Sequence, residues 1–412
     1  MYQERGETLT KRKFDGGGRT DSMTRQQLVL SLSKGLQDKV PPSARKGKIK
    51  SYSFFAKSFL FFIYYSSMYY PKTYTVESVT SGHPDKVCDQ ISDAILDACL
   101  TEDPKSRVAV ETFGSHNLLV IGGELSTRAR FPYEKIARRV YADIGYDDGL
   151  KVVTHVAEQS PDIAQGVDTG GAGDQGIMYG FATDETPELM PKTVLWVHRL
   201  AKGLEDLRRS GKFPWIKPDG KTQITVSNGN LQSVLVSVQH DREVTQEVIS
   251  HALREHLITP VVGDLSGVEV LVNPTGKFVQ GGFAADTGLT GRKIMVDTYC
   301  GLVPHGGGAF SGKDSTKVDR SAAYMARFTA KSIVREGRAR KCLVSVAYAI
   351  GRAQPLMTEA RDENGKDISS ALKKFDFRPH AIIERLGLRK PVFFETAAYG
   401  HFGKPGLAWE EV

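Results

Sequence analysis

Apolar and polar positions along the chain repeat with two periods, and they divide its larger part into three similar runs of elements. Alternating positions predict strands, and apolar positions three or four residues apart predict helices. The first run predicts strands and helices at 74–79, 85–100, 107–112, 117–124, 132–144 and 151–157. The second predicts them at 176–181, 187–209, 222–226, 231–239, 243–257 and 268–272, with a hairpin turn at Asn228 and Gly229.

The third run predicts a strand at 293–298, a helix at 317–336 and paired strands at 341–348 and near 355–359. A helix at 368–386 and a strand at 391–395 complete it. Each run reads β-α-β-β-α-β, so we expect an α+β fold with three similar domains around a pseudo-threefold axis. Helices should cover one face of each sheet, and the other faces should cover one another.

The expected boundaries are an N-terminal domain at 72–162, a central domain at 170–279 and a C-terminal domain at 281–412. Residues 1–71 form an N-terminal extension whose first 52 residues are polar and basic, which is typical of disorder. The apolar run at 53–65 is shorter than the ~20 residues that span a bilayer. Met68 directly precedes the first strand, so residues 1–67 are interpreted as a mis-set start or a dispensable tail. A membrane or targeting role is the alternative.

The net charge of +7 belongs to the beginning of the chain. Residues 1–70 hold 13 Lys and Arg against 5 Asp and Glu, so the rest of the chain carries −1. A pI near 9.0 is therefore no argument that the folded part binds nucleic acid. The four cysteines form no Cys-x-x-Cys pair, which favours buried thiols over a zinc site or disulfides.

A glycine-rich stretch at 305–320 is the strongest candidate for chemistry. Three glycines lead to Lys313, and Lys317, Asp319 and Arg320 follow within about two helical turns. Glycine backbone and lysines at a helix start are suited to phosphates, and an aspartate among them is suited to Mg²⁺. A glycine-rich turn before an ordinary basic helix is the alternative. The spacing fails as a P-loop, because Asp314 stands where that motif needs Ser or Thr.

The sequence Ser-Gly-His-Pro-Asp-Lys at 81–86 occupies the corresponding position of the first run. Both stretches bring a His, an Asp and a Lys to the start of a helix, which favours a shared Mg²⁺–phosphate site. A routine helix cap is the alternative reading of each aspartate. Glu111 and Glu124 lie on paired strands, where a solvated face is the simpler interpretation.

Several longer motifs carry a family resemblance. They are Gly-His-Pro-Asp-Lys at 82–86, Gly-Ala-Gly-Asp-Gln-Gly at 171–176, Asn-Pro-Thr-Gly at 273–276, Gly-Leu-Thr-Gly-Arg-Lys at 288–293, Gly-Gly-Gly-Ala-Phe-Ser-Gly-Lys-Asp at 306–314 and Glu-Thr-Ala-Ala-Tyr-Gly-His-Phe-Gly at 395–403. The chain from about residue 74 onward resembles S-adenosylmethionine synthetases. The resemblance implies that methionine sulfur attacks the ribose C5′ of ATP and displaces triphosphate, which the same site hydrolyses to diphosphate and phosphate.

The resemblance also implies roles for individual residues. Catalytic roles fall to His83, Arg292 and Lys313. The expected ATP contacts are His83, Asp219, Lys221, Lys277, Phe278, Asp286, Arg292, Lys293, Ala309 and Lys313. The expected methionine contacts are Glu124, Gln159, Asp286 and Lys317. Asp85 and Asp319 are the expected Mg²⁺ ligands, and Glu111 the expected K⁺ ligand.

By the same resemblance we expect two Mg²⁺ and K⁺ at each site and a cytoplasmic homodimer or homotetramer with sites at the subunit interface. Neither nucleic acid nor membrane is an expected partner. The loop at 166–170 is shorter than expected for the family. A triphosphatase or other ATPase that ignores methionine, and a regulatory paralogue that only binds partners, are the alternative functions.

Overall fold

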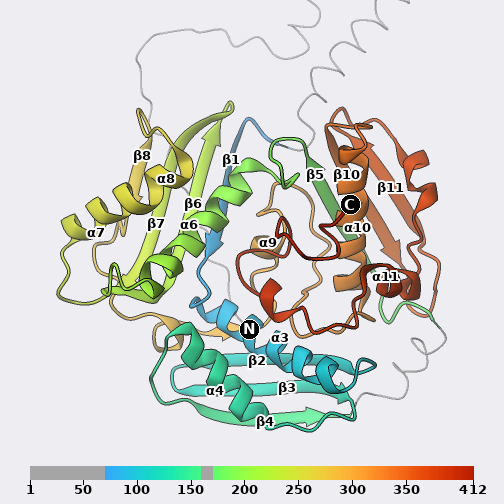
Figure 1. Ribbon diagram of the computed structural model, residues 1–412, viewed down its shortest axis with the longest axis horizontal. Helices are drawn as coiled ribbons and strands as arrows, with labels where there is room; N and C mark the ends of the chain where they lie inside the picture. The colour runs from blue at the N-terminus through green and yellow to red at the C-terminus, as the bar shows by residue number, and fades with distance from the viewer. Residues whose placement is uncertain (1–69, 159–169) are drawn as a thin grey trace, which may run out of the picture. The chain divides into compact units, whose positions relative to one another are not determined.

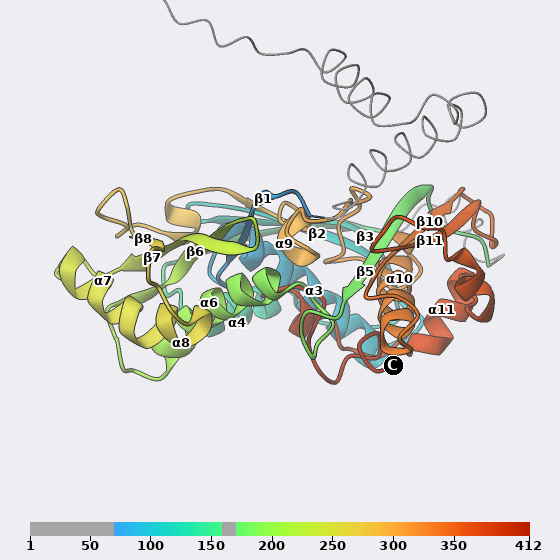
Figure 2. The same cartoon turned by 90° about the horizontal axis from the view of Figure 1, so that it is seen from above.

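The computed structural model describes residues 70–158 and 170–412. Predictions for residues 1–69, for Gln159 and for most of the short loop at 166–170 lie outside the described residues. The described chain folds into three sheets, each covered on one face by helices (Figures 1 and 2). The predicted α+β class with three sheet-and-helix domains is confirmed.

The first sheet has the strand order β4-β3-β2-β9, with helices α3 and α4 packed on it. Its elements are β2 (Arg107–Ser115), β3 (Leu118–Ser126), β4 (Lys151–Ala157), β9 (Gly288–Leu289), α3 (Pro84–Glu102) and α4 (Tyr133–Ile144). Helix α3 buries Val87, Ile91 and Ile95 in the core that also contains Val108 and Val110 of β2.

The second sheet has the order β1-β6-β7-β8, with α6 packed on β6 and β1, and α7 on β8. Its elements are β1 (Thr73–Val79), β6 (Ile216–Ser227), β7 (Asn230–His240), β8 (Glu269–Val272), α6 (Lys192–Arg209) and α7 (Gln246–Leu253). A π-helical turn (Arg254–Ile258) and α8 (Thr259–Val262) extend α7. The predicted hairpin is confirmed, since Asn228 and Gly229 both have positive φ between paired Ser227 and Asn230.

The third sheet has the order β11-β10-β5, with α10 packed on β5 and β10, and α11 packed on α10. Its elements are β5 (Gly176–Thr183), β10 (Lys341–Tyr348), β11 (Met357–Asp362), α10 (Val318–Arg335) and α11 (Pro379–Leu386).

The first strand of each sequence repeat belongs to the sheet of another repeat. Strand β1 pairs with β6, β5 pairs with β10, and β9 pairs with β2. This exchange is cyclic, as a threefold relation among the repeats requires. It also joins the three domains through backbone hydrogen bonds, so that loops distant in sequence meet near the start of α3.

Three predicted elements are wrong. Residues 293–298 contain the single helical turn α9 (Ile294–Asp297), and residues 391–395 end in a 3₁₀ turn (Phe394–Thr396) whose neighbouring amides bind the Asp97 carboxylate. The helix predicted at 368–386 is a 3₁₀ turn (Ser369–Lys374) followed by α11, because Pro379 prevents a helical conformation at Arg378.

The expectation that the helix-free sheet faces cover one another is also wrong for the described chain. Phe113, Val120 and Val153 are cross-strand neighbours on the helix-free face of the first sheet. The exposed fractions of Phe113 and Val153 are 38% and 41%. An exposed apolar row of this kind is typical of a surface that meets another protein surface.

Candidate active site

Helix α3 carries an aspartate row, defined here as Asp85, Asp89, Asp93 and Asp97. Because they are four residues apart, they lie along one side of the helix. Each accepts backbone N–H groups from the last third of the chain: Asp85 Oδ1 from Leu289 (3.0 Å), Asp89 Oδ1 from Gly291 (2.8 Å), Asp93 Oδ1 from Gly312 (2.8 Å) and Asp97 Oδ2 from Phe394 (2.8 Å). The helix therefore holds both glycine-rich loops that the sequence singled out.

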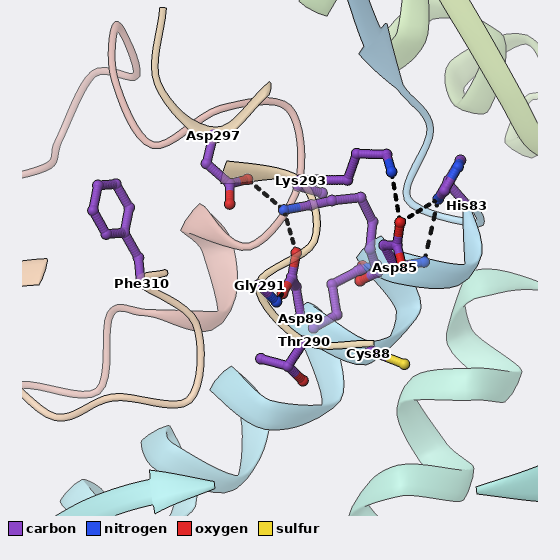
Figure 3. Close-up of polar contacts among 12 residues, drawn as sticks. His83, Asp85, Cys88, Asp89, Thr290, Gly291, Lys293, Asp297 and Phe310 are labelled. Carbon is purple, nitrogen blue, oxygen red and sulfur yellow. Dashed lines mark hydrogen bonds and ion pairs between the residues drawn. The ribbon is translucent and has the colours of Figure 1, made fainter. Parts of the chain in front are cut away.

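The first group of candidate side chains, called the α3 cluster, consists of His83, Asp85, Arg292 and Lys293. Figure 3 shows His83, Asp85 and Lys293 of this cluster. Lys293 Nζ lies 2.5 Å from Asp85 Oδ2, and Arg292 Nε lies 3.9 Å from Asp85 Oδ1. The Asp85 side chain is nearly fully buried, whereas that of Arg292 is 56% exposed. The cluster thus presents cationic groups to solvent beside a fixed carboxylate.

His83 is buried at the start of α3, where its Nδ1 accepts a hydrogen bond from Asp85 N (3.2 Å). Burial, together with the nearby charges of Lys293 and Lys221 and against that of Asp286, lowers the pKa of His83 to about 2. The imidazole is therefore neutral at physiological pH. A neutral ring that accepts at Nδ1 carries its proton on Nε2, so it can donate a hydrogen bond to a phosphate oxygen.

The second group, called the α10 cluster, consists of Lys313, Asp314, Lys317 and Asp319. Lys313 Nζ lies 2.7 Å from Asp319 Oδ2, and Lys317 pairs with buried Asp314. Burial alone would raise the pKa of Asp314, but the charge of Lys317 and the hydrogen bonds to the carboxylate lower it. Asp319 and Gly308 also line a pocket with His305 and Tyr179.

The two glycine-rich loops meet at Gly291 and Ala309. A Cβ added to Gly291 would lie 2.6 Å from Ala309 Cβ, so a glycine is needed at this approach. The second loop also pairs with β2, through a bridge between Lys313 and Ala109. These contacts fix the backbone of both clusters against the first sheet.

Asp219 is buried in β6, where its Oδ2 accepts a hydrogen bond from Gly282 N (2.9 Å). Its Oδ1 has no hydrogen-bond partner within residues 70–158 and 170–412. Burial raises the pKa of Asp219 to about 6, although the bond from Gly282 and the charge of Lys221 oppose the shift. An unpaired buried oxygen of this kind is suited to accepting a hydrogen bond from a ligand.

Of the other predicted ATP contacts, Lys221 lies on β6, and Lys277, Phe278 and Asp286 lie on the irregular chain that follows β8. Lys221, Lys277 and Asp286 are exposed, and Phe278 is half-buried with its N–H bonded to His240 Nε2 (3.1 Å). Asp286 accepts a hydrogen bond from Thr287 N (2.8 Å). The charges of Lys221 and Asp286 act on both His83 and Asp219, so both groups lie within electrostatic range of those two residues.

Glu111 and Glu124 lie on the helix-free face of the first sheet. Glu111 pairs with Gly122, and Glu124 pairs with Ala109, so both side chains point to the face that carries exposed Phe113. Glu111 is exposed and Glu124 is half-buried.

The sequence predicted one site containing Asp85, Lys313 and Asp319. The structure pairs Asp319 with Lys313 and pairs Asp85 with Lys293, and the shared site remains a prediction. Within the described ranges, no hydrogen bond or ion pair joins a side chain of the α3 cluster to one of the α10 cluster. Each cluster contains cations beside a carboxylate, Asp85 in one and Asp319 in the other, so each resembles half of a phosphate site.

Metal binding at these clusters is consistent with their donors. In the described part of the chain, no group of three or more His, Cys, Asp and Glu side chains can hold a metal ion. Mg²⁺ in phosphate-transfer sites is usually bound by one or two carboxylates, water and the substrate's own phosphates. Single carboxylates such as Asp85 and Asp319, beside lysines that attract phosphate, fit this arrangement.

Sequence reasoning missed the buried charges that hold the loops. Lys86 was expected beside phosphate, but it is fully buried and its Nζ contacts Asp89 Oδ2 (2.8 Å) and Asp297 Oδ1 (2.5 Å). Arg320 is also fully buried and forms two bonds with Asp93 (2.7 and 2.9 Å). The sequence feature that could have indicated these buried ion pairs is the four-residue spacing of the aspartate row. That spacing is ordinarily interpreted as a solvated helix face.

Comparison with known protein families decides among the expected functions. Models of the N-terminal, central and C-terminal domains of S-adenosylmethionine synthetase match residues 71–161, 169–278 and 280–411. The chain belongs to the S-adenosylmethionine synthetase family. The predicted family membership is therefore confirmed across the described part of the chain.

Individual relatives agree with the family models. S-adenosylmethionine synthase 1 of Rhodospirillum rubrum is 50% identical over 364 residues, which cover 82% of this chain and 95% of that protein. The synthase of Pseudothermotoga lettingae is 48% identical over 384 residues, covering 83% and 96%. This member of the S-adenosylmethionine synthetase family has no helix, within its described residues, that is long and apolar enough to cross a membrane.

Proposed function

We propose that the chain synthesises S-adenosylmethionine from ATP and L-methionine, as a methionine adenosyltransferase. The methionine sulfur attacks the ribose C5′ of ATP, the bond from C5′ to the triphosphate oxygen breaks, and the triphosphate is then hydrolysed to diphosphate and phosphate. Membership of the family supports the reaction. The structural observation that carries it is the pair of cationic clusters, each with a carboxylate, on loops held by α3.

The nucleophile in this reaction is the substrate's own sulfur, so the protein has to orient two reactants and stabilise the leaving triphosphate. The cysteines agree with this role, since all four are buried and burial raises the pKa of each thiol. None is therefore an activated thiolate. The cations of the two clusters supply the positive charge that stabilises the departing triphosphate.

We assign the phosphates of ATP to His83, Arg292, Lys293 and Lys313. Neutral His83 donates a hydrogen bond to an oxygen near the breaking bond, and the cations balance the charge that develops on the triphosphate. Asp85 and Asp319 would hold two Mg²⁺, which would neutralise phosphate charge. We assign the rest of ATP to the remaining predicted contacts, which are Asp219, Lys221, Lys277, Phe278, Asp286 and Ala309.

The other assignments follow the family resemblance. Glu124, Gln159, Asp286 and Lys317 are assigned to methionine, and Glu111 to K⁺. We further propose domains at 72–162, 170–279 and 281–412, and a location in the cytoplasm. Within the described residues, no hydrogen bond or ion pair joins the side chains of the α3 and α10 clusters, which is compatible with a homodimer or homotetramer in which each active site takes one cluster from each subunit.

Methionine-dependent product formation tests this function. The wild-type protein with ATP, Mg²⁺ and K⁺ should form S-adenosylmethionine and release phosphate only when methionine is added. Asp85→Asn should lower kcat/KM by at least about 100-fold, because a metal ligand beside the leaving group is lost. Chromatography of the product and a phosphate assay measure the two outputs.

Asp206→Asn, which changes an exposed aspartate on α6, is the matched control and should keep wild-type activity. Phosphate release that ignores methionine would instead support the triphosphatase alternative. No turnover by the wild-type protein would support the regulatory paralogue. Near-normal activity of Asp85→Asn would remove Asp85 from the site.

A further inference from the structure

The segment that carries Arg292 and Lys293 lies directly on the first turns of α3. Asp85 Oδ1 and Asp89 Oδ1 bind the N–H groups of Leu289 and Gly291, two residues apart on this segment. Between them, Thr290 Oγ1 lies 2.8 Å from Ser92 Oγ of the same helix. A Cβ added to Gly288 would lie 2.2 Å from Pro84 O, so the backbones touch. Four consecutive residues are thus fixed immediately before Arg292.

A buried ion triad of Lys86, Asp89 and Asp297 binds the other end of this segment. Figure 3 labels its two carboxylates, Asp89 and Asp297. Lys86 Nζ contacts Asp89 on α3 and Asp297 at the end of α9. Asp297 N in turn donates a hydrogen bond to Lys293 O (2.9 Å). The triad therefore binds the chain on both sides of Arg292 and Lys293, although none of its three members is exposed enough to meet a ligand.

Each oxygen of Asp89 has a different donor. Oδ1 accepts from the backbone of Gly291, and Oδ2 accepts from Lys86. A carboxylate can satisfy both donors, whereas an amide in its place must turn an N–H group toward one of them. Burying three charged groups is costly, and replacement by apolar residues often leaves stability unchanged or higher. Removing one member would leave another charged and buried, so the triad holds together the two elements that it joins.

We propose that Asp89, through the triad with Lys86 and Asp297, is a positioning residue that sets Arg292 and Lys293 against Asp85 for triphosphate binding. The inference rests on the proposed function, since it assigns the triphosphate to those two cations. Arg292 is largely exposed and its ion pair with Asp85 is long, at 3.9 Å, so the position of its backbone largely determines where the side chain points. A displacement of this backbone by about 1 Å is enough to lower turnover by about 100-fold.

Asp89→Asn and Asp97→Asn form a matched pair for the test. Both aspartates lie on α3 and accept backbone N–H groups, but the partners of Asp97 are Phe393 and Phe394, outside both clusters. Calorimetry of the full-length protein with inorganic tripolyphosphate and Mg²⁺ measures the tripolyphosphate affinity of each variant. Asp89→Asn should weaken tripolyphosphate affinity about tenfold and kcat about 100-fold, and Asp97→Asn should leave both within about threefold.

A mutant cycle with the double variant Arg292→Met/Lys293→Met separates positioning from general destabilisation. If Asp89 acts through these two cations, Asp89→Asn should add less than about threefold to the affinity loss already caused by the double variant. A merely structural role would make the two losses multiply, and would lower the affinity in Asp97→Asn in proportion to its loss of Tm. Either result would overturn the proposal, as would an unchanged affinity in Asp89→Asn.

Should Asp89→Asn fail to accumulate as folded protein, Thr290→Val tests the same segment at a smaller cost. It removes the hydroxyl that contacts Ser92 and should weaken tripolyphosphate binding by about threefold, whereas unchanged binding would overturn the proposal. The wild-type assay separates this inference from the function on which it rests. If wild-type protein makes S-adenosylmethionine and Asp89→Asn does so equally well, only the positioning role fails. If wild-type protein makes none, the proposed function fails and the inference fails with it.

Discussion

Gly308 leaves room for the carboxylate of Asp319. A Cβ added to Gly308 would lie 2.1 Å from Asp319 Oδ1 and 2.7 Å from Asp319 Cβ, so the aspartate has to move. The backbone of Gly308 is not left-handed, so alanine adds bulk without backbone strain. Gly308→Ala should raise the Mg²⁺ concentration for half-maximal activity by about tenfold while Tm stays close to that of the wild type.

The control for this prediction is Gly149→Ala, since a Cβ at Gly149 meets no atom within 4 Å. A magnesium titration of activity, together with thermal unfolding, measures both variants. An unchanged magnesium requirement in Gly308→Ala would argue that Asp319 is not a metal ligand.

His198 makes stability depend on pH. It is buried on α6, its Nδ1 lies 2.9 Å from Ser78 Oγ, and burial lowers its pKa to about 3, with the charge of Lys404 acting in the same direction. The unfolded chain binds a proton near pH 6.5 that the folded chain does not bind. The contribution of His198 to the free energy of unfolding therefore falls by about 1.4 kcal/mol for each pH unit below 6.5, until about pH 3.

His198→Asn removes this titration, so Tm should fall less steeply between pH 7 and pH 5 than it does in the wild type. His251→Asn, which replaces a histidine whose side chain is 82% exposed, should keep the wild-type slope. Thermal unfolding at several pH values and one protein concentration measures the slopes. Equal slopes in His198→Asn and wild type would show that His198 is already protonated in the folded protein.

The sequence indicated which residue types are suited to binding phosphate, but it did not indicate which individual residues are buried. Glycine-rich spacing led to Lys313 and Asp319, because phosphate chemistry needs those residue types close together in the chain. The same spacing did not distinguish Lys86, which is buried with two carboxylates, from Lys293, which is partly exposed to solvent. The partners of Lys86 include Asp297, more than 200 residues away, and no local pattern carries that information.

At the scale of elements, α3 and α10 are joined by a buried ion pair. Arg320 of α10 forms two bonds with Asp93 of α3, and it also donates to the carbonyls of Phe310 and Lys313. Arg320→Met leaves Asp93 charged and buried, so it should lower the free energy of unfolding by about 3–5 kcal/mol. A strongly reduced Tm is the measured result.

Arg138→Met is the matched control, because Arg138 and Glu134 form an exposed pair on α4 that should contribute less than about 1 kcal/mol. Similar Tm values for Arg320→Met and Arg138→Met would contradict the prediction. They would mean that water or another group replaces the guanidinium at Asp93.

Elements with strong local signals were predictable, and those held by distant side chains were not. The strands β4 and β10 have the predicted bounds, and Asn228 with Gly229 turns the predicted hairpin. Residues 391–395 have an apolar pattern suited to a strand, but the Asp97 carboxylate binds the amides that a neighbouring strand would need. Tertiary contacts there override the local preference.

At the scale of the molecule, the order of elements was predictable and their assignment to sheets was not. Each repeat was expected to build its own sheet, yet β1, β5 and β9 each join the sheet of another repeat. Alternation identifies a strand and its buried face, but it does not identify the neighbouring strand. The exchange also explains why the α3 cluster combines residues from the first and last thirds of the chain.

The separation of the two clusters leads to a test with mixed subunits. Asp85→Asn disables the α3 cluster, and Lys313→Met disables the α10 cluster, so each variant alone should be nearly inactive. If each active site takes one cluster from each subunit, a mixed dimer has one site with both clusters intact. Random association of equal amounts makes half of the dimers mixed, and half of their sites intact, so about a quarter of wild-type activity should return.

Co-expression of the two variants with different tags, followed by purification on both tags, isolates the mixed dimers. Their S-adenosylmethionine formation should approach half of the wild-type rate per dimer, because one of two sites is restored. The control is a mixed dimer of two differently tagged Asp85→Asn subunits, which should remain inactive. A mixed dimer that is also inactive would mean that both clusters of one subunit serve the same site. In that case, a subunit that covers exposed Phe113 and Val153 would contribute no residue to the active site.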